Sequence, residues 1–349
     1  MPDTLTKLAY QTFQQGKQYF GITHKTLSNN LMKTFQPPKN VETQEVDLKT
    51  LQRLQQRMAA LLEQDWQDAE AGVYPKQLLF DNPWDDFLRF YPLVWLDLPK
   101  IWQRATDRNH HSFAKDIDTS GYPQYYLQNF HHQTDGYLSD LSAHLYDLQV
   151  EILFNGNADP MRRRILPSLK AGVTGVEKAK ILDVACGTGR TLSMIRAMLP
   201  KASLYGVDLS PAYLRKANET LSAQPGVLPQ LIQANGEALP FVDDYFDAVV
   251  SVFLFHELPA AARQNVIDQA FRVIKPGGTL VLCDSIQRVD SPEFEVMMDN
   301  FPAMFHEPYY RHYTTDDLNS RLITAGFEEV TNQVHFMSKY WVAQKPAIA

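Results

Sequence analysis

Two acidic residues and two glycines, spaced along residues 181–208, have the types and spacing needed for ligand chemistry. Asp183 lies inside a short apolar run, and Gly187 and Gly189 follow in a turn that leads into a helical pattern. Asp208 ends the next apolar run, 21 residues after Gly187 (208 − 187). Near this separation, a doubly wound fold places a carboxylate beside a bound ribose. The spacing therefore predicts a site for a nucleoside.

The kind of nucleoside follows from a departure from the dinucleotide pattern. Leu192 stands where the third glycine of G-x-G-x-x-G would be, and Asp183 suits an ammonium group better than a phosphate. With Gly187, Gly189 and Asp208, this pattern resembles the first motifs of the class I S-adenosylmethionine-dependent methyltransferases. The resemblance continues over residues 165–345 and favours the small-molecule branch with cores of the quinone and sterol C-methyltransferase type. Further matching segments lie at residues 233–241, 245–252 and 272–284.

The resemblance implies S-adenosylmethionine as the cofactor and suggests a role for each matching position. Asp183 would help to hold the methionine ammonium group, and Asp208 would accept hydrogen bonds from both ribose hydroxyls. Leu209 would pack on the adenine, and Asn235 would accept from the adenine amino group. Main-chain groups would contact the ligand at Ala185, Gly187, Gly189 and Gly236.

Candidates for catalysis follow the predicted fourth and fifth strands. His256 and Glu257 come after an apolar run that ends at residue 252, and His306 lies in a later connection. Any of them could remove a proton from a methyl acceptor, although lining the pocket remains an alternative role for His256. Candidates for substrate contact, with packing between domains as the alternative, are Tyr122, Tyr126, His131, Tyr309, Tyr310 and Arg311.

Two other polar patterns are interpreted as non-catalytic. The adjacent pairs His110-His111 and His131-His132 predict no metal site, because neighbouring side chains on a helix or strand point apart. The basic residues 162–164 could meet an acidic substrate or a phosphate, but the pattern favours a solvated helix face.

Composition narrows the classes of partner. The net charge of −7 is spread evenly, so no basic face for nucleic acid is expected. Cys186 and Cys283 both fall on core segments without metal or disulfide spacing, which fits a reducing cytoplasm. Residues 1–35 show no continuous apolar stretch, so neither a signal peptide nor a membrane span is predicted. A peripheral membrane contact through their amphipathic face stays open.

The chain is expected to form two parts. Residues 1–150 predict an all-α, aromatic-rich lid or substrate domain, with helices over residues 1–35 and 47–71 and a linker at 36–40. Residues 151–349 predict the cofactor domain of an α/β protein. The resemblance implies a Rossmann-like sheet of seven strands whose last strand is antiparallel. Strands are expected near residues 181–185, 203–207, 228–233, 246–252 and 279–284, followed by a hairpin over 327–343.

These features predict a methyltransferase whose acceptor is small, apolar or aromatic and is held between the helical part and the sheet. A protein or macromolecule methyltransferase and a non-catalytic scaffold are the alternatives. An intact Asp183 and Asp208 argue against the scaffold. The signature Asn-Pro-Pro-Tyr of many macromolecule methyltransferases is absent after the fourth strand, where residues 251–256 read Ser-Val-Phe-Leu-Phe-His. Carbon, oxygen and nitrogen all stay open as the accepting atom.

Overall fold

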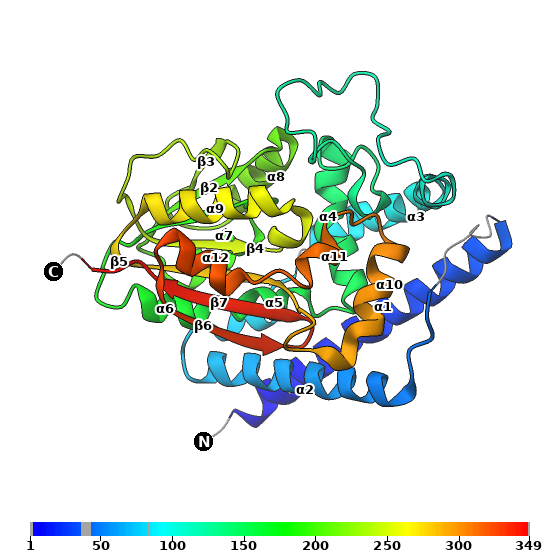
Figure 1. Cartoon of the computed structure of the whole chain (residues 1–349). Helices are drawn as coiled ribbons and strands as arrows, with labels where there is room; N and C mark the ends of the chain where they lie inside the picture. The colour runs from blue at the N-terminus through cyan, green and yellow to red at the C-terminus, as the bar shows by residue number, and fades with distance from the viewer. Residues whose placement is uncertain (1–2, 36–42, 83, 348–349) are drawn as a thin grey trace.

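A seven-stranded mixed sheet forms the centre of the molecule within the described residues 3–35, 43–82 and 84–347 of this computed structural model (Figure 1). Its strand order is β3-β2-β1-β4-β5-β7-β6. The strand β7 is antiparallel to both of its neighbours, and the other adjacent pairs are parallel. The predicted α/β fold and its closing antiparallel hairpin are confirmed. The strands are β1 (Lys180–Val184), β2 (Ser203–Asp208), β3 (Gln230–Gln233), β4 (Phe246–Val252), β5 (Ile274–Ser285), β6 (Glu328–His335) and β7 (Ser338–Gln344).

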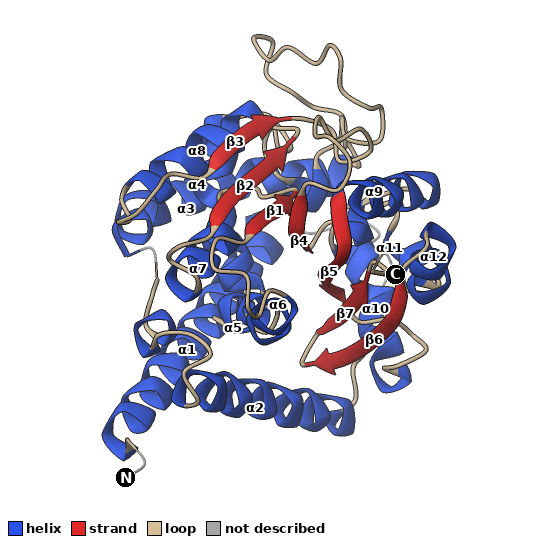
Figure 2. Ribbon diagram, turned by 90° about the vertical axis from the view of Figure 1, so that its left-hand side faces the viewer, coloured by secondary structure: helices blue, strands red, loops and turns tan. Residues whose placement is uncertain are grey.

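Helices cover both faces of the sheet (Figure 2). One face packs against α6 (Leu166–Gly172), α7 (Arg190–Met198) and α8 (Pro211–Ser222), and the other against α9 (Ala260–Val273) and α12 (Leu318–Ala325). Because the central strands are buried on both faces, their sequences are nearly continuous apolar runs. The parallel strands all end at one edge of the sheet, where their following loops meet.

The described residues before α6 form helices and loops. The helices are α1 (Thr4–Phe35), α2 (Leu48–Glu70), α3 (Trp84–Asp107), α4 (Asp140–Leu153) and α5 (Ala158–Arg163). The predicted helix over residues 1–35 is one continuous element, and α3 runs on through Pro92 and Pro99. The linker expected at 36–40 lies outside the described residues. Among the described residues, no helix has both the length and the apolar character needed to cross a bilayer.

The N-terminal helices pack beside the sheet as well as over its strand ends. Tyr10 of α1 and Trp66 of α2 belong to the same apolar cluster as Leu169 of α6 and Ile195 of α7. Nearer the N-terminus of α2, Leu54 lines a cavity at the strand ends. The helix α2 therefore lies along the flank of the molecule, whereas the aromatic segment of residues 121–137 lies across the strand ends.

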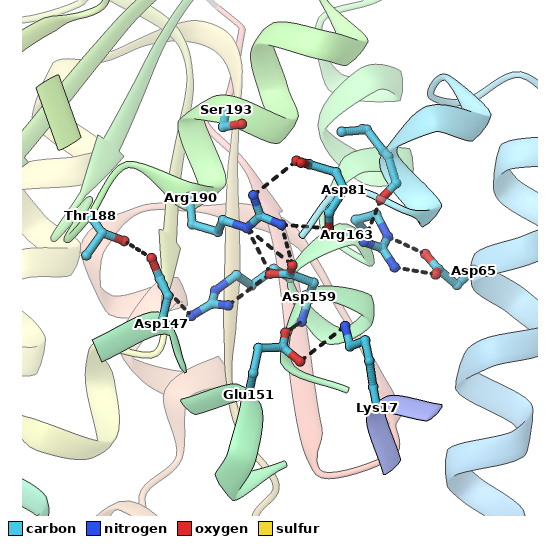
Figure 3. A network of polar contacts seen from close by, with 12 residues as sticks. Lys17, Asp65, Asp81, Asp147, Glu151, Asp159, Arg163, Thr188, Arg190 and Ser193 are labelled. Carbon is cyan, nitrogen blue, oxygen red and sulfur yellow. Dashed lines mark hydrogen bonds and ion pairs between the residues drawn. The ribbon is translucent and has the colours of Figure 1, made fainter. Parts of the chain in front are cut away.

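The basic residues of α5 and its C-cap are buried, which contradicts the predicted solvated face. Arg163 binds Asp65 of α2 through two hydrogen bonds of 2.8 and 2.6 Å, and both side chains are at most 1% exposed (Figure 3). Arg162 pairs with Asp159 at 3.1 Å, and Arg164 pairs with Asp68. Arg163 and Arg164 bind α2 to the rest of the molecule. The sequence pattern could not show this, because their main partners on α2 lie about a hundred positions away.

Candidate active site

A cavity of about 120 Å³ lies at the carboxyl ends of β1, β2 and β4. The turn after β1 is built from left-handed backbone, with φ of 60° at Ala185, 53° at Gly187 and 79° at Gly189. This turn aims its amide groups at the end of β2. Gly187 N donates to Asp208 Oδ2 at 2.9 Å, and Ser210 N donates to Asp208 Oδ1 at 2.8 Å. The cavity is therefore framed by a tight turn and a fixed carboxylate.

Most of the predicted cofactor residues line this cavity. The lining includes Ala185, Gly187, Asp208, Leu209, Asn235 and Gly236. Burial raises the pKa of Asp208 to about 6, even though backbone amides stabilise its charged form. The two hydroxyls of a bound ribose would donate further hydrogen bonds to this carboxylate.

Asp183 lies just behind the lining, at 1% exposure. Its Oδ2 accepts no hydrogen bond from any described residue. Burial, followed by the nearby charge of Asp208, raises the pKa of Asp183 well above its usual range. A buried carboxylate without a donor is costly, and an ammonium group, directly or through water, would supply one. This orphaned oxygen fits the methionine end of S-adenosylmethionine.

Gly189 stands apart from the predicted cofactor residues that line the cavity. It is the N-cap of α7 and is not part of the cavity lining. A Cβ at this position would lie 3.0 Å from Leu221 Cδ1 and 3.1 Å from Ala217 Cβ, both on α8. Glycine is required here by its left-handed φ and by the close approach of α8, so Gly189 shapes the turn without lining the ligand space.

The opposite end of the cavity is narrow and polar. Asn235 Oδ1 accepts from Glu237 N at 2.9 Å, which leaves one lone pair for an adenine amino group. At Gly236, a Cβ would lie 3.0 Å from Val184 Cγ1, so a side chain would crowd the cavity wall. Tyr125 donates to Glu237 Oε1 at 2.5 Å and ties the aromatic segment to this end.

A second cavity, of about 300 Å³, adjoins the first. The two share Tyr146, Phe253 and Glu257 in their linings. The wall of the second cavity is mainly apolar and comes from α2, α4, α10 (Glu295–Met304) and the β6–β7 turn. Its apolar members include Leu54, Val150, Phe301, Met304, Phe305 and Met337.

Four polar side chains gather on one side of the second cavity, and we refer to them as the His–Glu cluster: His131, His256, Glu257 and Glu307. His131 Nε2 lies 3.0 Å from Glu307 Oε1 and 3.7 Å from Glu257 Oε1. His256 Nε2 lies 4.0 Å from Glu257 Oε1. Imidazole and carboxylate groups can exchange protons near neutral pH, and they are also common ligands of divalent metals.

Short structured turns hold the members of the cluster. His131 belongs to the turn Phe130–His132 and has a left-handed φ of 54°, which is uncommon for a non-glycine residue. His256 and Glu257 belong to the turn Phe255–Glu257 after β4. Asp284, at the end of β5, binds His256 Nδ1 at 2.7 Å and accepts from Phe255 N at 2.6 Å. Asp284 therefore fixes both the ring and the turn that carries it.

The cluster is electrostatically uneven. Burial alone would lower the pKa of His131 and His256, but the nearby carboxylates raise both pKa values by more than burial lowers them. Glu307 and Glu257 raise the pKa of His131 to about 10, and Asp284 leads the groups that raise the pKa of His256 to about 9. Burial raises the pKa of Glu307, whose side chain is fully buried.

Comparison with known proteins gives a consistent picture. Residues 181–278 match the family model described as a methyltransferase domain. A ubiquinone/menaquinone biosynthesis C-methyltransferase of Desulfotalea psychrophila is 33% identical over 146 residues, which cover 42% of this chain and 56% of that protein. The corresponding enzyme of Pasteurella multocida is 30% identical over 206 residues, covering 53% and 74%. The chain belongs to the S-adenosylmethionine-dependent methyltransferases.

The coverage of these relatives is partial. A demethylmenaquinone methyltransferase of Thermus thermophilus is 34% identical, and the match covers 40% of this chain and 60% of that protein. The methyltransferase chain thus spans less than two thirds of the first two relatives' own length. Among solved structures, human N-acetylserotonin methyltransferase in complex with S-adenosylmethionine is 14% identical, with a TM-score of 0.49 and coverage of 71% and 67%.

Several residues predicted for this methyltransferase's substrate or catalytic site lie outside both cavity linings. His306 stacks on His110 with ring centroids 3.7 Å apart, and its Nε2 is 2.7 Å from Gln128 Oε1. Burial lowers the pKa of His306 to about 3, with His110 adding to the effect. Its neighbour Glu307 also lies outside both linings, but its Oε1 meets His131 Nε2 at 3.0 Å. The adjacent position, and not the predicted one, therefore belongs to the His–Glu cluster.

The predicted substrate residues divide in a similar way. Tyr126 lines the first cavity, and His131 and Tyr310 line the second. Tyr122 stacks on Tyr126 at 5.5 Å from behind, and Tyr309 packs beside the same aromatic cluster. Arg311 is exposed and lines neither cavity, because Tyr310 and Tyr313 take the inward face of their short helix α11 (Tyr310–Tyr313).

Sequence reasoning missed part of the cavity lining. Tyr146 and Tyr213 meet with their ring planes 71° apart, and both line the first cavity. Arg162 and Asp147 line it as well, and Asp147 accepts from Thr188 Oγ1 at 2.7 Å. The tyrosines fit ordinary helical patterns, so their sequence gave no functional signal. Asp147 could have been noticed only as a charge within a largely apolar segment, whereas Arg162 belongs to the basic residues 162–164, for which the sequence favoured a solvated face.

Proposed function

We propose that this chain transfers the methyl group of S-adenosylmethionine to a small, apolar or aromatic acceptor held in the second cavity. The observation that supports this most directly is the contact between the two cavities at the carboxyl ends of the strands. Tyr146, Phe253 and Glu257 belong to both linings, so a ligand in one cavity would meet a ligand in the other there. Bringing two reactants together in this way is worth about 7–11 kcal/mol at best.

The first cavity would hold the cofactor at three points. Asp183 would receive the methionine ammonium group, Asp208 the ribose hydroxyls, and Asn235 with Gly236 the adenine. When bound, the cofactor supplies an electrophilic methyl group on a sulfonium. The aromatic rings of Tyr126 and Tyr137 on the cavity wall would shield that sulfonium from water and face its charge with their π systems.

The lining of the second cavity suits a flat, mostly hydrocarbon acceptor with at least one polar group. Phe301, Phe305 and Met337 offer apolar surface, and the His–Glu cluster offers a polar side. Several of the relatives are named for ubiquinone and menaquinone biosynthesis. A reduced quinone, with hydroxyls beside a ring carbon that can accept a methyl group, suits both sides of this cavity.

Proton removal would accompany methyl transfer to such an acceptor. Glu257 lies on both cavity linings, and Tyr137 donates to its Oε1. A proton released from the acceptor would reach Glu257 first, with His131 and His256 next to it. General-base assistance of this kind typically contributes about 10²–10⁴ in rate. The predicted catalytic roles of His256 and Glu257 are retained in this proposal, and that of His306 is not.

We also propose a division of labour along the chain. Residues 1–150 would serve as the substrate domain, because they supply His131, Tyr146 and Leu54 to the acceptor cavity. Residues 151–349 would serve as the cofactor domain, because they supply the β1 turn and Asp208.

The test is a binding and transfer experiment with a labelled methyl group. Calorimetry should show one S-adenosylmethionine per chain, and incubation with S-adenosylmethionine carrying a deuterated methyl group should label a hydroquinone, as read by mass spectrometry. A panel of hydroquinones, phenols and peptides separates the small-molecule function from a macromolecular one. Absence of cofactor binding in the folded chain would support the scaffold alternative, and labelling confined to peptides would overturn the acceptor proposal.

A further inference from the structure

We propose that the His–Glu cluster binds a divalent transition-metal ion with a preference for nitrogen and oxygen ligands, such as Mn²⁺, Fe²⁺ or Zn²⁺. One ligand atom from each of His131, His256, Glu257 and Glu307 can be chosen so that all four lie within 4.8 Å of one another. With metal–ligand bonds of about 2.0–2.2 Å, two ligands on opposite sides of an ion are at most about 4.4 Å apart. Shifts of the ligand atoms by a few tenths of an ångström would therefore complete the site.

Glu307 provides the second observation that points to a cation. Its side chain is 0% exposed, and neither carboxylate oxygen accepts a hydrogen bond of good geometry from the described residues. The nearest cationic group is His131 Nε2, at 3.0 Å from Oε1. Among the described residues, His131 is thus the one close cationic partner of this fully buried carboxylate, and a buried charge is costly unless it is well paired or bound to a metal. An ion between Glu307 and Glu257 would supply the missing partner of Glu307 and add one to Glu257, whose Oε1 accepts from Tyr137.

The orientation of His256 also fits metal binding. Its Nδ1 lies 2.7 Å from Asp284 Oδ1, so its Nε2 is the atom that remains for the cluster. Asp284 is itself held by Phe255 N and Ser285 N, at 2.6 and 2.7 Å. A carboxylate on the far nitrogen of a histidine is the usual outer support of a metal ligand, since it fixes the ring and raises its basicity.

The adjacent histidines His131 and His132, for which the sequence predicted no metal site, do not act as a pair in this proposal. His132 does not join His131, and its ring lies 5.5 Å from that of His110. The partners of His131 come from the turn after β4 and from the segment before α11. Only the folded chain brings these three segments together.

The position of the cluster suggests what the ion would do, a step that rests on the proposed function. His131, His256 and Glu257 line the acceptor cavity, so an ion among them would face the acceptor. Four protein ligands leave two open positions on an octahedral ion, which suit the hydroxyl or carbonyl oxygens of a ring. The ion would hold such an acceptor by its oxygens and set the angle at which the ring meets the cofactor cavity.

The experiment measures metal binding directly. The tag-free chain is stripped with a chelator, dialysed, and titrated with Zn²⁺ in a calorimeter, and the visible absorption of added Co²⁺ reports ligand geometry. We expect one high-affinity equivalent of Zn²⁺ per chain and Co²⁺ bands typical of nitrogen and oxygen ligands. The variants His131→Ala and Glu307→Gln should each weaken Zn²⁺ binding by at least about tenfold, the lower end of what loss of an outer partner alone costs.

Matched controls separate this site from surface binding. His111→Ala removes an exposed histidine and Glu177→Gln an exposed glutamate, and both should bind Zn²⁺ as the wild type does. Circular dichroism checks that each variant is folded. Because His131 and Glu307 lie in different segments, a local folding defect in one variant would not explain a loss of Zn²⁺ binding in both. Equal Zn²⁺ binding by wild type and cluster variants, or no stoichiometric binding at all, would overturn the proposal. Because S-adenosylmethionine affinity is measured separately in each sample, failure of the proposed function and failure of the metal site give different results.

Discussion

Two buried groups of charged side chains differ in how completely their charges are paired. In the arginine–aspartate network, the main pairs are Arg163 with Asp65 at 2.6 Å and Arg190 with Asp159 at 2.5 Å (Figure 3). In the His–Glu cluster, the buried Glu307 lacks a well-formed hydrogen bond from the described residues. Saturated pairs stabilise one arrangement of the chain, whereas an incompletely paired buried group marks a place for a ligand or a reaction.

The two groups also differ in the elements that carry them. The arginine–aspartate network joins helices, with Asp65 on α2, Asp159 and Arg163 on α5, and Arg190 on α7. The His–Glu cluster comes from short turns and a connecting segment at the edge of the sheet. Helices hold their side chains in fixed rotamers, while loops supported by a rigid sheet are common carriers of function. The comparison predicts that substitutions in the two groups will separate stability from activity.

The largest effect is expected from Arg163→Met. This change leaves Asp65 buried without its bidentate partner, and breaking a buried pair costs about 3–5 kcal/mol of unfolding free energy. Denaturant unfolding measures the loss. The exposed pair Lys201–Glu177 is the control, and Lys201→Ala should cost about 0–1 kcal/mol. A loss for Arg163→Met as small as that of the control would contradict the structural role of the network.

Next in size is Glu257→Gln, which removes the carboxylate shared by both cavities. Methyl transfer at saturating cofactor should fall about 10²-fold, the lower end of general-base effects. Turnover with the identified acceptor is the measurement. Turnover within a factor of two of wild type would show that Glu257 only lines the cavity.

Asp208→Ala tests the cofactor cavity. The loss of charge-assisted hydrogen bonds to ribose should weaken S-adenosylmethionine binding by about 2 kcal/mol, or roughly 30-fold. Calorimetry on the folded variant decides it. Asp243→Ala, which removes a mostly exposed carboxylate, should bind the cofactor with unchanged affinity. Equal affinity in both variants would remove Asp208 from the ribose site.

A smaller effect is expected from Glu307→Gln on stability, in contrast to Arg163→Met. Because burial disfavours the charged form of Glu307, a neutral amide of similar shape should change the unfolding free energy by less than about 1 kcal/mol, or raise it. The same denaturant titration checks this. A loss as large as that of Arg163→Met would show that the His–Glu cluster is a structural ion pair.

The smallest effect is expected from Arg311→Ala. The side chain is exposed and lines neither cavity, so stability should stay within about 0.5 kcal/mol and methyl transfer should be unchanged. Thermal unfolding and turnover measure the two quantities. A marked fall in turnover would restore the substrate role that the sequence predicted for Arg311.

The parts of the site that were predictable depend on short sequence separations. Gly187 and Asp208 follow two adjacent parallel strands, so the strand pattern alone places them together. Glu307 could not be found in this way, because it meets His131 and Glu257 only through the fold. The sequence singled out His306, whereas the adjacent Glu307 joins the His–Glu cluster, since a connecting segment has no periodicity that shows which side chain meets distant partners.

The same limit applies to charge. Basic residues 162–164 resemble a solvated helix face, and their burial follows from acidic partners elsewhere in the chain, such as Asp65 and Asp68. Pairing across such separations leaves no local signal. The α/β class and the strand positions were predictable because apolar runs of strand length, alternating with helices, admit few arrangements.

The position of β7 has a consequence for the order in which the protein can assemble. The strand β6 precedes β7 in the chain, yet it joins the sheet only through β7, which inserts between β5 and β6. Until β7 has been synthesised, β5 therefore keeps an open edge. The pairing of β7 with β5 sets Lys339 opposite Asp284 and Ser338 opposite Ser285. The carboxylate that orients His256 is thus fixed by a strand that is synthesised only after β5 and β6.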